Sequence, residues 1–179
     1  TEGPDDPGDD PQLRHRAVFV GIDGVRADAL QAADTPHVDS LLGNAAFSFD
    51  ARTHDSVTSS GPGWTSIFTG VQPAKHTVFG NGAYDELDPA VTPSFLLRAK
   101  QELGATTALA YQWPDIGSGI VSYDAVDDAS WAGDEEIAPW IAEQIEDADH
   151  DVLALVLDDT DHAGHEYGFD AGAQGYLDA

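Results

Sequence analysis

The chain of 179 residues contains no cysteine and no methionine, and only seven of its residues are basic. Because cysteine is absent, thiolate metal sites and disulfide frameworks are both excluded. Thr1 stands where an open reading frame would place methionine, so we expect a processed or engineered start and the loss of any targeting segment. No apolar run approaches the roughly 20 residues of a transmembrane helix, and the sequence therefore predicts no membrane span.

Positive charge is scarce beside 33 acidic residues, which leaves a formal net charge of −26. Such a field repels polyanions, so we expect no nucleic-acid-binding surface and no binding to anionic membranes. A hydrophobic content of 41% with clear apolar runs indicates a folded chain rather than a disordered acidic one. The excess of aspartate over lysine resembles halophilic archaeal proteins, whose self-repulsion is screened in molar salt because the Debye length falls to about 3 Å.

Residues 1–15 combine proline, glycine and acid with almost nothing to bury, so they are predicted to form a flexible acidic tail. Residues 16–179 are predicted to form the N-terminal part of one α/β domain. The tail resembles a linker left by a secretion or anchor segment, which favours an extracytoplasmic location, either secreted or at the cell surface. The cytoplasm of a salt-accumulating cell is the alternative, because it would demand the same acidity.

Short apolar runs alternate along the chain with segments of helical spacing. Nearly continuous apolar runs are typical of strands that are buried on both faces of a parallel sheet. We therefore predict an α/β fold with a mostly parallel sheet covered by helices on both faces, and an incomplete sheet because few residues follow the last strand. The stretch 112–133 is predicted to be irregular. The predicted strands are 17–22, 46–52, 106–111 and 152–157, and the predicted helices are 35–44, 64–70, 93–103 and 134–145.

Two candidate site residues lie at the end of a predicted strand and at the start of a predicted helix. Asp23 follows the run 17–22, and open α/β sheets bind ligands at the carboxyl ends of their strands. A turn or helix-capping role for this aspartate is the alternative. Ser60 precedes a Gly-Pro-Gly turn ahead of a helix, where it can be either a nucleophile served by helix N–H groups or only a cap.

The most specific segment is Asp161-His162-Ala163-Gly164-His165, directly after the strand 152–157. Asp161 and His165 can converge on one divalent cation if the chain turns at Gly164. A carboxylate with a neutral imidazole suits zinc or manganese. His162 is expected to point aside, and an acidic surface turn with incidental histidines is the alternative interpretation.

Together these segments resemble the alkaline phosphatase superfamily, and within it the nucleotide pyrophosphatase/phosphodiesterase-like branch. Asp23 after a strand is similar to the family's first metal ligand. Ser60 lies nine residues before Thr69-Gly70, which is the family's spacing between its nucleophile and a Thr-Gly pair. Asp161-x-x-Gly164-His165 matches its Asp-x-x-Gly-His metal motif, and the resemblance runs in the family's order through residues 17–168.

The resemblance implies a metal-dependent hydrolase of phosphate mono- or diesters with Ser60 as nucleophile. By that resemblance, Asp23 and Ser60 bind one divalent cation, and Asp161 and His165 bind another about 4 Å away. Zinc is expected, with manganese or a mixed pair as alternatives, and the substrate would be a small phosphate ester or a nucleotide. The family's further ligands, an Asp-His pair and a later His, have no counterpart after His165. A missing C-terminal segment or a second chain is therefore expected to complete the site, and the isolated chain is expected to be inactive.

Several positions depart from the family or remain open. Trp64 occupies the place at which a sulfatase needs arginine, so sulfatase chemistry is disfavoured. Gly63 stands where the diesterases carry asparagine three places after the nucleophile, so monoesters and diesters both stay open. Asn81 and Asp115 are candidate substrate contacts by loop position alone. Two other functions remain as alternatives, a non-catalytic or degenerate cation-binding domain and a phosphomutase-like transfer of phosphate.

Overall fold

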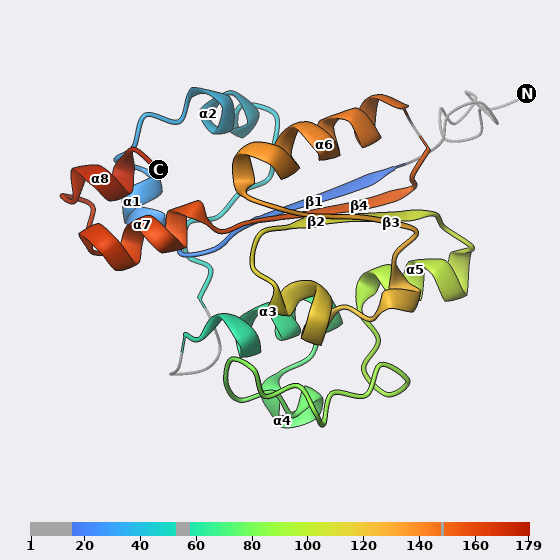
Figure 1. The fold of residues 1–179 in the computed structure, drawn as a ribbon. Coiled ribbons are helices and arrows are strands. Elements are labelled where there is room, and N and C mark those ends of the chain that lie inside the picture. Colours follow the sequence, from blue (N-terminus) through green and yellow to red (C-terminus); the bar gives the residue numbers. More distant parts are fainter. Residues whose placement is uncertain (1–15, 53–57, 148) are drawn as a thin grey trace, which may run out of the picture.

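The computed structural model describes residues 16–52, 58–147 and 149–179, and the predicted tail at 1–15 lies outside this part of the chain. Strands and helices alternate along it (Figure 1). The strands are β1 (Ala17–Ile22), β2 (Thr107–Tyr111), β3 (Asp128–Trp131) and β4 (Val152–Leu157). The helices are α1 (Ala27–Leu30), α2 (Pro36–Leu42), α3 (Ser60–Thr69), α4 (Pro73–His76), α5 (Phe95–Leu103), α6 (Asp134–Asp147), α7 (Asp159–Tyr167) and α8 (Gln174–Leu177), with a π-helical turn at Ile116–Ile120 and a 3₁₀ turn at Tyr123–Ala125.

The four strands form one sheet in the order β1-β4-β2-β3, and every neighbouring pair is parallel. This confirms the predicted α/β class and the strands expected at 17–22, 106–111 and 152–157. Helices lie on both faces of the sheet, with α6 on one face and α3 and α5 on the other (Figure 1). β1 and β3 are the two edges of this sheet, and β4 and β2 lie inside it.

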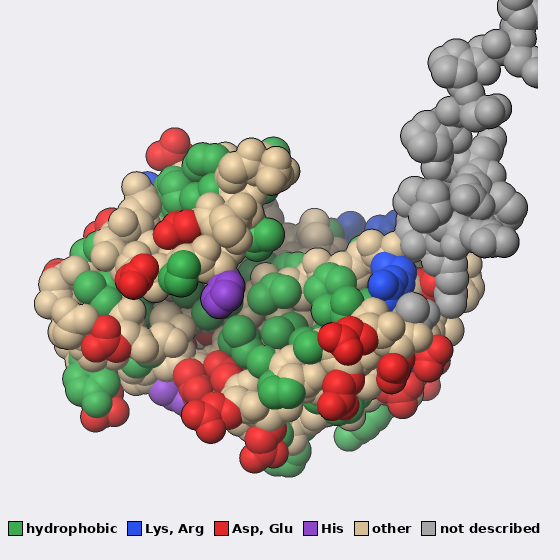
Figure 2. Space-filling view, turned by 90° about the horizontal axis from the view of Figure 1, so that it is seen from above, with side chains coloured by type: hydrophobic (Ala, Val, Ile, Leu, Met, Phe, Trp, Pro, Cys, Tyr) green, Lys and Arg blue, Asp and Glu red, His purple; other side chains and the backbone are tan. Residues whose placement is uncertain are grey.

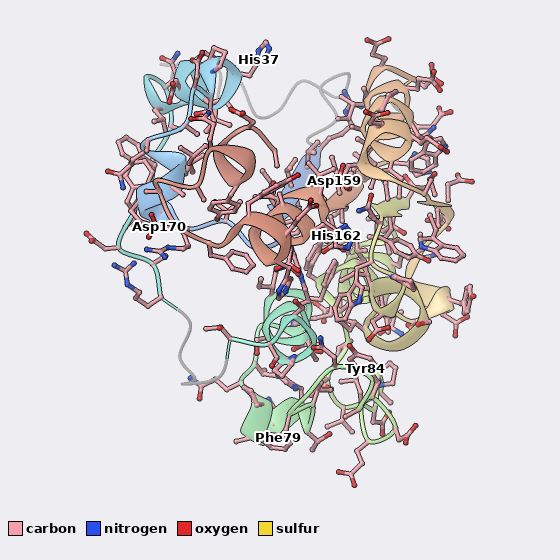
Figure 3. The ribbon with its side chains drawn as sticks, turned by 60° about the vertical axis from the view of Figure 1, so that its left-hand side comes forward. His37, Phe79, Tyr84, Asp159, His162 and Asp170 are labelled. Atoms are coloured by element: carbon pink, nitrogen blue, oxygen red, sulfur yellow. The ribbon has the colours of Figure 1, made fainter. Side chains whose placement is uncertain are left out.

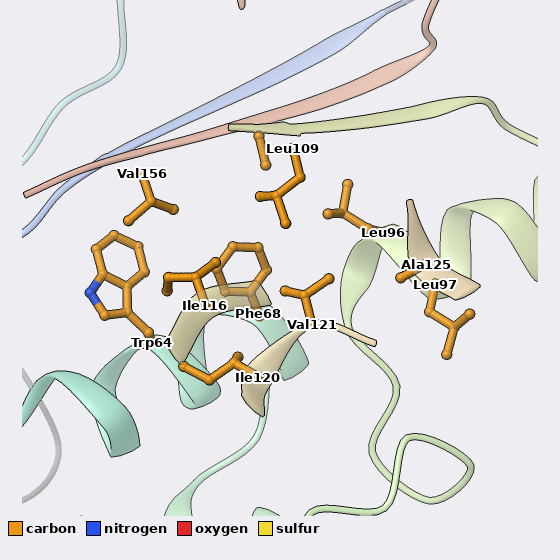
Figure 4. Close-up of a cluster of buried hydrophobic side chains, with 11 residues drawn as sticks. Trp64, Phe68, Leu96, Leu97, Leu109, Ile116, Ile120, Val121, Ala125 and Val156 are labelled. Carbon is orange, nitrogen blue, oxygen red and sulfur yellow. The ribbon is translucent and has the colours of Figure 1, made fainter. Parts of the chain in front are cut away.

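Two buried clusters attach the helices to the sheet. On one face, Ile137 and Ile141 of α6 pack with Leu153 and Leu155 of β4. On the other face, α3, α5 and the π-helical turn enclose a larger cluster around Phe68, whose ring stacks on Phe95 with centroids 5.2 Å apart (Figure 4). Full burial of side chains of this size stabilises the fold by about 1.5–3 kcal/mol each. The two clusters therefore hold a helical layer against each face of the sheet.

Local signals explain where the main helices begin and end. Ser94 caps α5, because its hydroxyl accepts the N–H of Leu97 at 3.2 Å, and Gly104 ends the helix with a left-handed φ of 65°. The first turn of α6 is acidic, which suits the positive end of a helix dipole. No helix in the described ranges is long and apolar enough to cross a membrane.

Two local predictions are wrong. The stretch 46–52 contains no strand; Phe47 and Phe49 contact each other in a loop with ring centroids 5.5 Å apart. The stretch 112–133 is not wholly irregular, because it contains β3. β3 lacks the continuous apolar run that identifies the other strands, because its sequence is half polar and its residues are mostly exposed at the sheet edge.

Candidate functional site

The carboxyl ends of β1 and β4 meet around Gly24. The N–H of Asp23 donates to the carbonyl of Leu157 at 2.9 Å. Gly24 has a left-handed φ of 74°, and a Cβ at this position would lie 2.5 Å from the Cα of Asp161. Only glycine fits such a conformation and such a close approach, so the chain after β1 lies directly against the first turn of α7.

Asp161 and His165 lie one turn apart on α7. Nε2 of His165 is 3.4 Å from Oδ2 of Asp161. The predicted turn at Gly164 is wrong, because α7 continues through this glycine. Gly164 is instead needed for packing, since a Cβ there would lie 2.1 Å from the ring of Phe169. Helical spacing places residues i and i+4 on one face, and this spacing brings Asp161 and His165 together.

Asp158 is a buried carboxylate at this site that the sequence analysis missed. It is only 5% exposed, and its Oδ2 lies 3.3 Å from Nε2 of His162. Burial raises the pKa of Asp158 to about 6; a charged His162 opposes this shift, and the charges of Asp23 and Asp161 add to it. The pKa of Asp161 is also raised, first by burial and then by the charge of Asp23. Three carboxylates therefore share a region in which their negative charges repel one another.

Asp134, the first residue of α6, anchors the start of α7. Its carboxylate accepts the N–H of Asp158 at 2.9 Å and the N–H of Asp159 at 2.9 Å. Gln112 after β2 donates its amide to the carboxylate of Asp159 at 2.8 Å and accepts the N–H of Asp134 at 2.7 Å. His162 lies 3.3 Å from the same Gln112 amide, so it faces Gln112 as well as Asp158. Figure 3 shows Asp159 and His162 at the start of α7.

Ser60 is the first residue of α3, so this helix begins earlier than the sequence predicts. Trp64 lies one turn further on, and its indole Nε1 donates to Oδ2 of Asp23 at 2.8 Å. The indole is buried against Gly21, where a Cβ would lie 2.3 Å from the ring. Because residues four apart share a helix face, Ser60 lies on the side of α3 that is directed toward Asp23.

The residue after Ser60 is surrounded by polar groups from two loops. The N–H of Gly61 donates to Oδ1 of Asn81 at 2.7 Å, and a Cβ on Gly61 would lie 3.0 Å from this oxygen and from the hydroxyl of Tyr84. The Tyr84 hydroxyl donates to Asp115 at 2.8 Å. Burial and this hydrogen bond raise the pKa of Tyr84. The structure thus places Asn81 beside the start of α3. It also connects Asp115 to the start of α3 through Tyr84, a residue that no sequence pattern indicated.

His76 is buried where the loop after α4 meets α3. Its Nδ1 accepts the N–H of Val78 at 3.1 Å, and its Nε2 lies 2.9 Å from the hydroxyl of Ser66. Since Nδ1 accepts a hydrogen bond, we assign the proton of the neutral ring to Nε2, which donates to Ser66. This connection fixes the loop that leads to Asn81 against the helix that begins with Ser60.

The donor groups fit part of a divalent-cation site. Within the described ranges, no group of three or more His, Asp or Glu is arranged to hold a metal ion. Asp23, Asp161 and His165 are nevertheless ligand types that suit zinc or manganese. Burial first, and then the charge of neighbouring carboxylates, raise the pKa values of Asp158 and Asp161, and a cation would offset both effects.

The chain matches one protein family over most of its length. The family described as type I phosphodiesterase / nucleotide pyrophosphatase matches residues 17–178. No curated protein sequence matches the chain.

Three solved structures have a similar fold. Murine ectonucleotide pyrophosphatase/phosphodiesterase 5, as an inactive variant in complex with AMP, gives a TM-score of 0.68 at 20% identity and covers 91% of this chain and 48% of its own. Another structure of that murine protein gives 0.68 at 20% identity, with coverage of 92% and 49%. Phosphonoacetate hydrolase from Sinorhizobium meliloti 1021, in complex with phosphonoacetate, gives 0.53 at 16% identity, with coverage of 92% and 53%. The chain thus shares their fold and spans about half of their length.

Proposed function

Because the chain belongs to the type I phosphodiesterase/nucleotide pyrophosphatase family, within the alkaline phosphatase superfamily, we propose that it supplies part of a two-metal site that hydrolyses phosphate esters through Ser60. The observation that carries this proposal is the 2.8 Å hydrogen bond from Trp64 to Asp23. It joins the helix that begins with Ser60 to the carboxylate at the end of β1. This contact supports a site in which the Ser60 hydroxyl and the proposed ligand Asp23 lie at the same end of the sheet.

Four side chains of this chain would bind the cations. Asp23 and Ser60 would hold one, and Asp161 and His165 would hold the other. Carboxylate and imidazole ligands favour zinc, and they also fit manganese or a mixed pair. Cations in such sites activate the attacking oxygen and neutralise charge on the phosphate.

Ser60 would attack the phosphate. Its Oγ forms a bond to phosphorus as the bond to the ester oxygen breaks, and water later hydrolyses the phosphoserine. The positive end of the α3 dipole favours an anion at this position, although the N–H of Gly61 is bonded to Asn81 and Pro62 has no N–H to offer. Oδ1 of Asn81 is engaged by Gly61, so the amide N–H groups of Asn81 remain to donate to a phosphate oxygen beside Ser60.

Only part of the site is assigned to this chain. No three-ligand cluster occurs among the described residues, and the structural neighbours are about twice as long. We infer that a further segment of the protein, or a second chain, contributes the remaining ligands. The proposed substrate is a small phosphate ester or a nucleotide, in keeping with the AMP and phosphonoacetate bound by the two neighbours.

A non-catalytic cation-binding domain is the second candidate. The described part of the chain has no complete ligand set, and this favours a role in which Asp161 and His165 bind one cation without turnover. Such a domain would bind zinc but would hydrolyse no phosphate ester, even as the full-length gene product.

Turnover by the zinc-loaded, full-length gene product tests the proposal, with p-nitrophenyl phosphate and bis-p-nitrophenyl phosphate as substrates. Ser60→Ala is expected to lower turnover by at least about 10³-fold, because the covalent path is lost. Ser59→Ala is the matched control, since the Ser59 side chain makes no capping hydrogen bond at the start of α3. Unchanged turnover in Ser60→Ala, or an equal loss in both variants, would contradict the nucleophile assignment.

The proposal also includes an extracytoplasmic location and adaptation to molar salt. The first rests on the composition of residues 1–15, and the second on the net charge of −26. Screening of this charge predicts a melting temperature that rises steadily as KCl is raised to molar concentration. A melting temperature that is independent of salt would contradict the adaptation.

A further inference from the structure

The carboxylate of Asp23 accepts a hydrogen bond on each of its two oxygens. Oδ1 accepts the N–H of Gly24 at 2.8 Å, and Oδ2 accepts Nε1 of Trp64 at 2.8 Å. The first donor is the next residue in the chain, whereas the second lies 41 residues further along, on α3. The contact with Trp64 is therefore the one through which the tertiary fold sets the direction of this side chain.

The backbone around Asp23 is held on both sides. The N–H of Asp23 donates to the carbonyl of Leu157 at 2.9 Å and so continues the pairing of β1 with β4. The carbonyl of Gly24 accepts the hydroxyl of the buried Tyr176 at 2.6 Å. Rotation of the side chain is the freedom that remains to Asp23, and the indole N–H restricts it.

Gly21 makes room for the indole on the same face of β1. Alternate residues of a strand share a face, and Phe19, Gly21 and Asp23 all contact Trp64. A Cβ on Gly21 would lie 2.3 Å from Cη2 of the indole and 2.6 Å from Cζ3. The six-membered ring therefore fills the space that a side chain at position 21 would need, and the indole N–H extends to Asp23, two residues later.

The rest of the indole is packed into the core. Trp64 is only 5% exposed, and its ring contacts the rings of Phe19 and Phe68 with centroids 6.4 and 6.2 Å apart. Figure 4 shows the indole at the end of the buried cluster, with its nitrogen on the side away from the other cluster residues. Because protein interiors are densely packed, a buried ring of this size is held in one orientation. The donor to Asp23 is therefore rigid.

This donor is also neutral, which matters for a metal ligand. An arginine or lysine beside Asp23 would orient the carboxylate but would also cancel the charge that attracts a cation. The indole N–H carries no charge and donates one hydrogen bond, so each carboxylate oxygen keeps a lone pair for a cation. Basic side chains number 7 against 33 acidic ones, and Figure 2 shows one face on which acidic side chains outnumber basic ones. The contact with Trp64 therefore orients Asp23 without compensating its charge.

The proposed ligands on α7 are held less firmly. Nε2 of His165 and Oδ2 of Asp161 lie 3.4 Å apart, and these side chains are 72% and 20% exposed. An exposed side chain such as that of His165 changes rotamer within nanoseconds, so its orientation is not set in advance. The indole contact is therefore expected to act on the cation at Asp23 and not on the cation at Asp161 and His165.

We propose that Trp64 is a positioning residue for Asp23, and that Gly21 provides the space for its indole. The inference rests on the proposed role of Asp23 as a ligand and extends it, because it assigns the orientation of that ligand to a residue of α3. Partners that orient a metal ligand change metal affinity by about 10–100-fold. Loss of the indole N–H should weaken the zinc-binding step that uses Asp23 by about tenfold and leave the other step unchanged.

An isosteric replacement separates the hydrogen bond from the packing. Benzothienylalanine has the shape of tryptophan with sulfur in place of the indole N–H, so in place of Trp64 it keeps the ring contacts and removes the donor. In calorimetric zinc titration of the full-length gene product, one of the two binding steps should weaken by about tenfold. The same replacement of Trp140, which packs on the other face of the sheet, is the matched control and should change neither step.

The indole N–H also reports on the contact directly by nuclear magnetic resonance. Its resonance is identified by its absence from Trp64→Phe. This resonance should move when zinc binds the carboxylate that accepts the hydrogen bond, and the indole resonance of Trp140 should not. A Trp64 resonance that stays unchanged at saturating zinc would contradict the inference.

Gly21→Ala gives a second test that keeps the tryptophan. The added Cβ would lie 2.3 Å from the indole and displace it, so zinc binding at Asp23 should weaken. In Trp64→Phe the shorter ring leaves room for this Cβ, and Gly21→Ala should have little further effect. Residues that act through one contact give such non-additive losses, and fully additive losses would count against the coupling.

Asp23→Asn distinguishes this inference from the proposed function. If Asp23→Asn leaves zinc affinity unchanged, the ligand assignment fails and the positioning inference fails with it. If Asp23→Asn weakens zinc binding and benzothienylalanine in place of Trp64 does not, only the positioning inference fails. Equal weakening of both zinc-binding steps by that replacement would indicate a general structural role for the indole and would also overturn the inference.

Discussion

The two sides of the candidate site differ in charge. The side formed by β1, β4 and α7 carries Asp23, Asp158 and Asp161; burial and then the charge of Asp23 raise the pKa values of Asp158 and Asp161. The side formed by the start of α3 has no acid in its first turn and begins with the hydroxyl-bearing Ser60. The first side favours a cation, and the helix dipole of the second favours an anion. In the proposed function, a phosphate would lie between a cation on the first side and the start of α3, which Trp64 joins to Asp23.

Removing one acid from the side formed by β1, β4 and α7, the proposed metal side, should have the largest effect. Asp161→Asn is expected to weaken zinc binding by at least about 100-fold, because Asp161 is a proposed direct ligand and loss of a direct ligand exceeds the effect of an outer-shell change. Calorimetric titration of the full-length protein measures it. Glu166→Gln removes the same charge from the same helix at an exposed position and is expected to change affinity by severalfold at most. Equal losses in the two variants would mean that only net charge matters.

A change at the start of α3, the proposed anion side, should affect turnover and leave metal binding intact. Asn81→Ala is expected to lower kcat/KM by about 10²-fold, because it removes the proposed donor to the phosphate and the acceptor of the Gly61 N–H. Zinc affinity should stay the same, which distinguishes this variant from Asp161→Asn. Asn44→Ala, at an exposed position near α2, is the control. A large loss of zinc affinity in Asn81→Ala would contradict the division into two sides.

The pH dependence of the zinc-free protein gives a smaller effect on the metal side. The pKa of Asp158 rises from 3.8 to about 6 on folding, so the folded state binds the proton more tightly than the unfolded state. This contribution to stability is greatest below the unfolded pKa and is lost as pH rises toward the folded pKa. Relative to the wild type, Asp158→Asn should therefore gain stability between these two pH values, as measured by urea unfolding. A difference that does not change with pH would contradict the assignment of this carboxylate.

The sequence predicts the fold better than the site. The strands 17–22 and 152–157 are found because their apolar runs are continuous, and β3 is missed because an edge strand needs no such run. The strand predicted at 46–52 is absent: this stretch is a loop in which Phe47 and Phe49 contact each other instead of pairing with the sheet. A pattern of residues therefore identifies central strands more readily than edges.

At the site, motif spacing locates Asp161 and His165 but gives the wrong reason for their proximity. The structure shows a continuous helix through Gly164 in place of a turn, and the glycine serves packing, because Phe169 lies where a side chain would stand. The burial of Asp158 and the bond from Trp64 to Asp23 depend on segments far apart in the sequence, and no local pattern reveals them.

The most direct test of the account is whether Ser60 becomes phosphorylated. The zinc-loaded, full-length protein is mixed with a phosphate ester, quenched in acid and analysed by peptide mass spectrometry. The account predicts one phosphate on the peptide that begins α3, located on Ser60 and absent from Ser60→Ala. Phosphate on another residue, or steady turnover by Ser60→Ala at the wild-type rate, would contradict it.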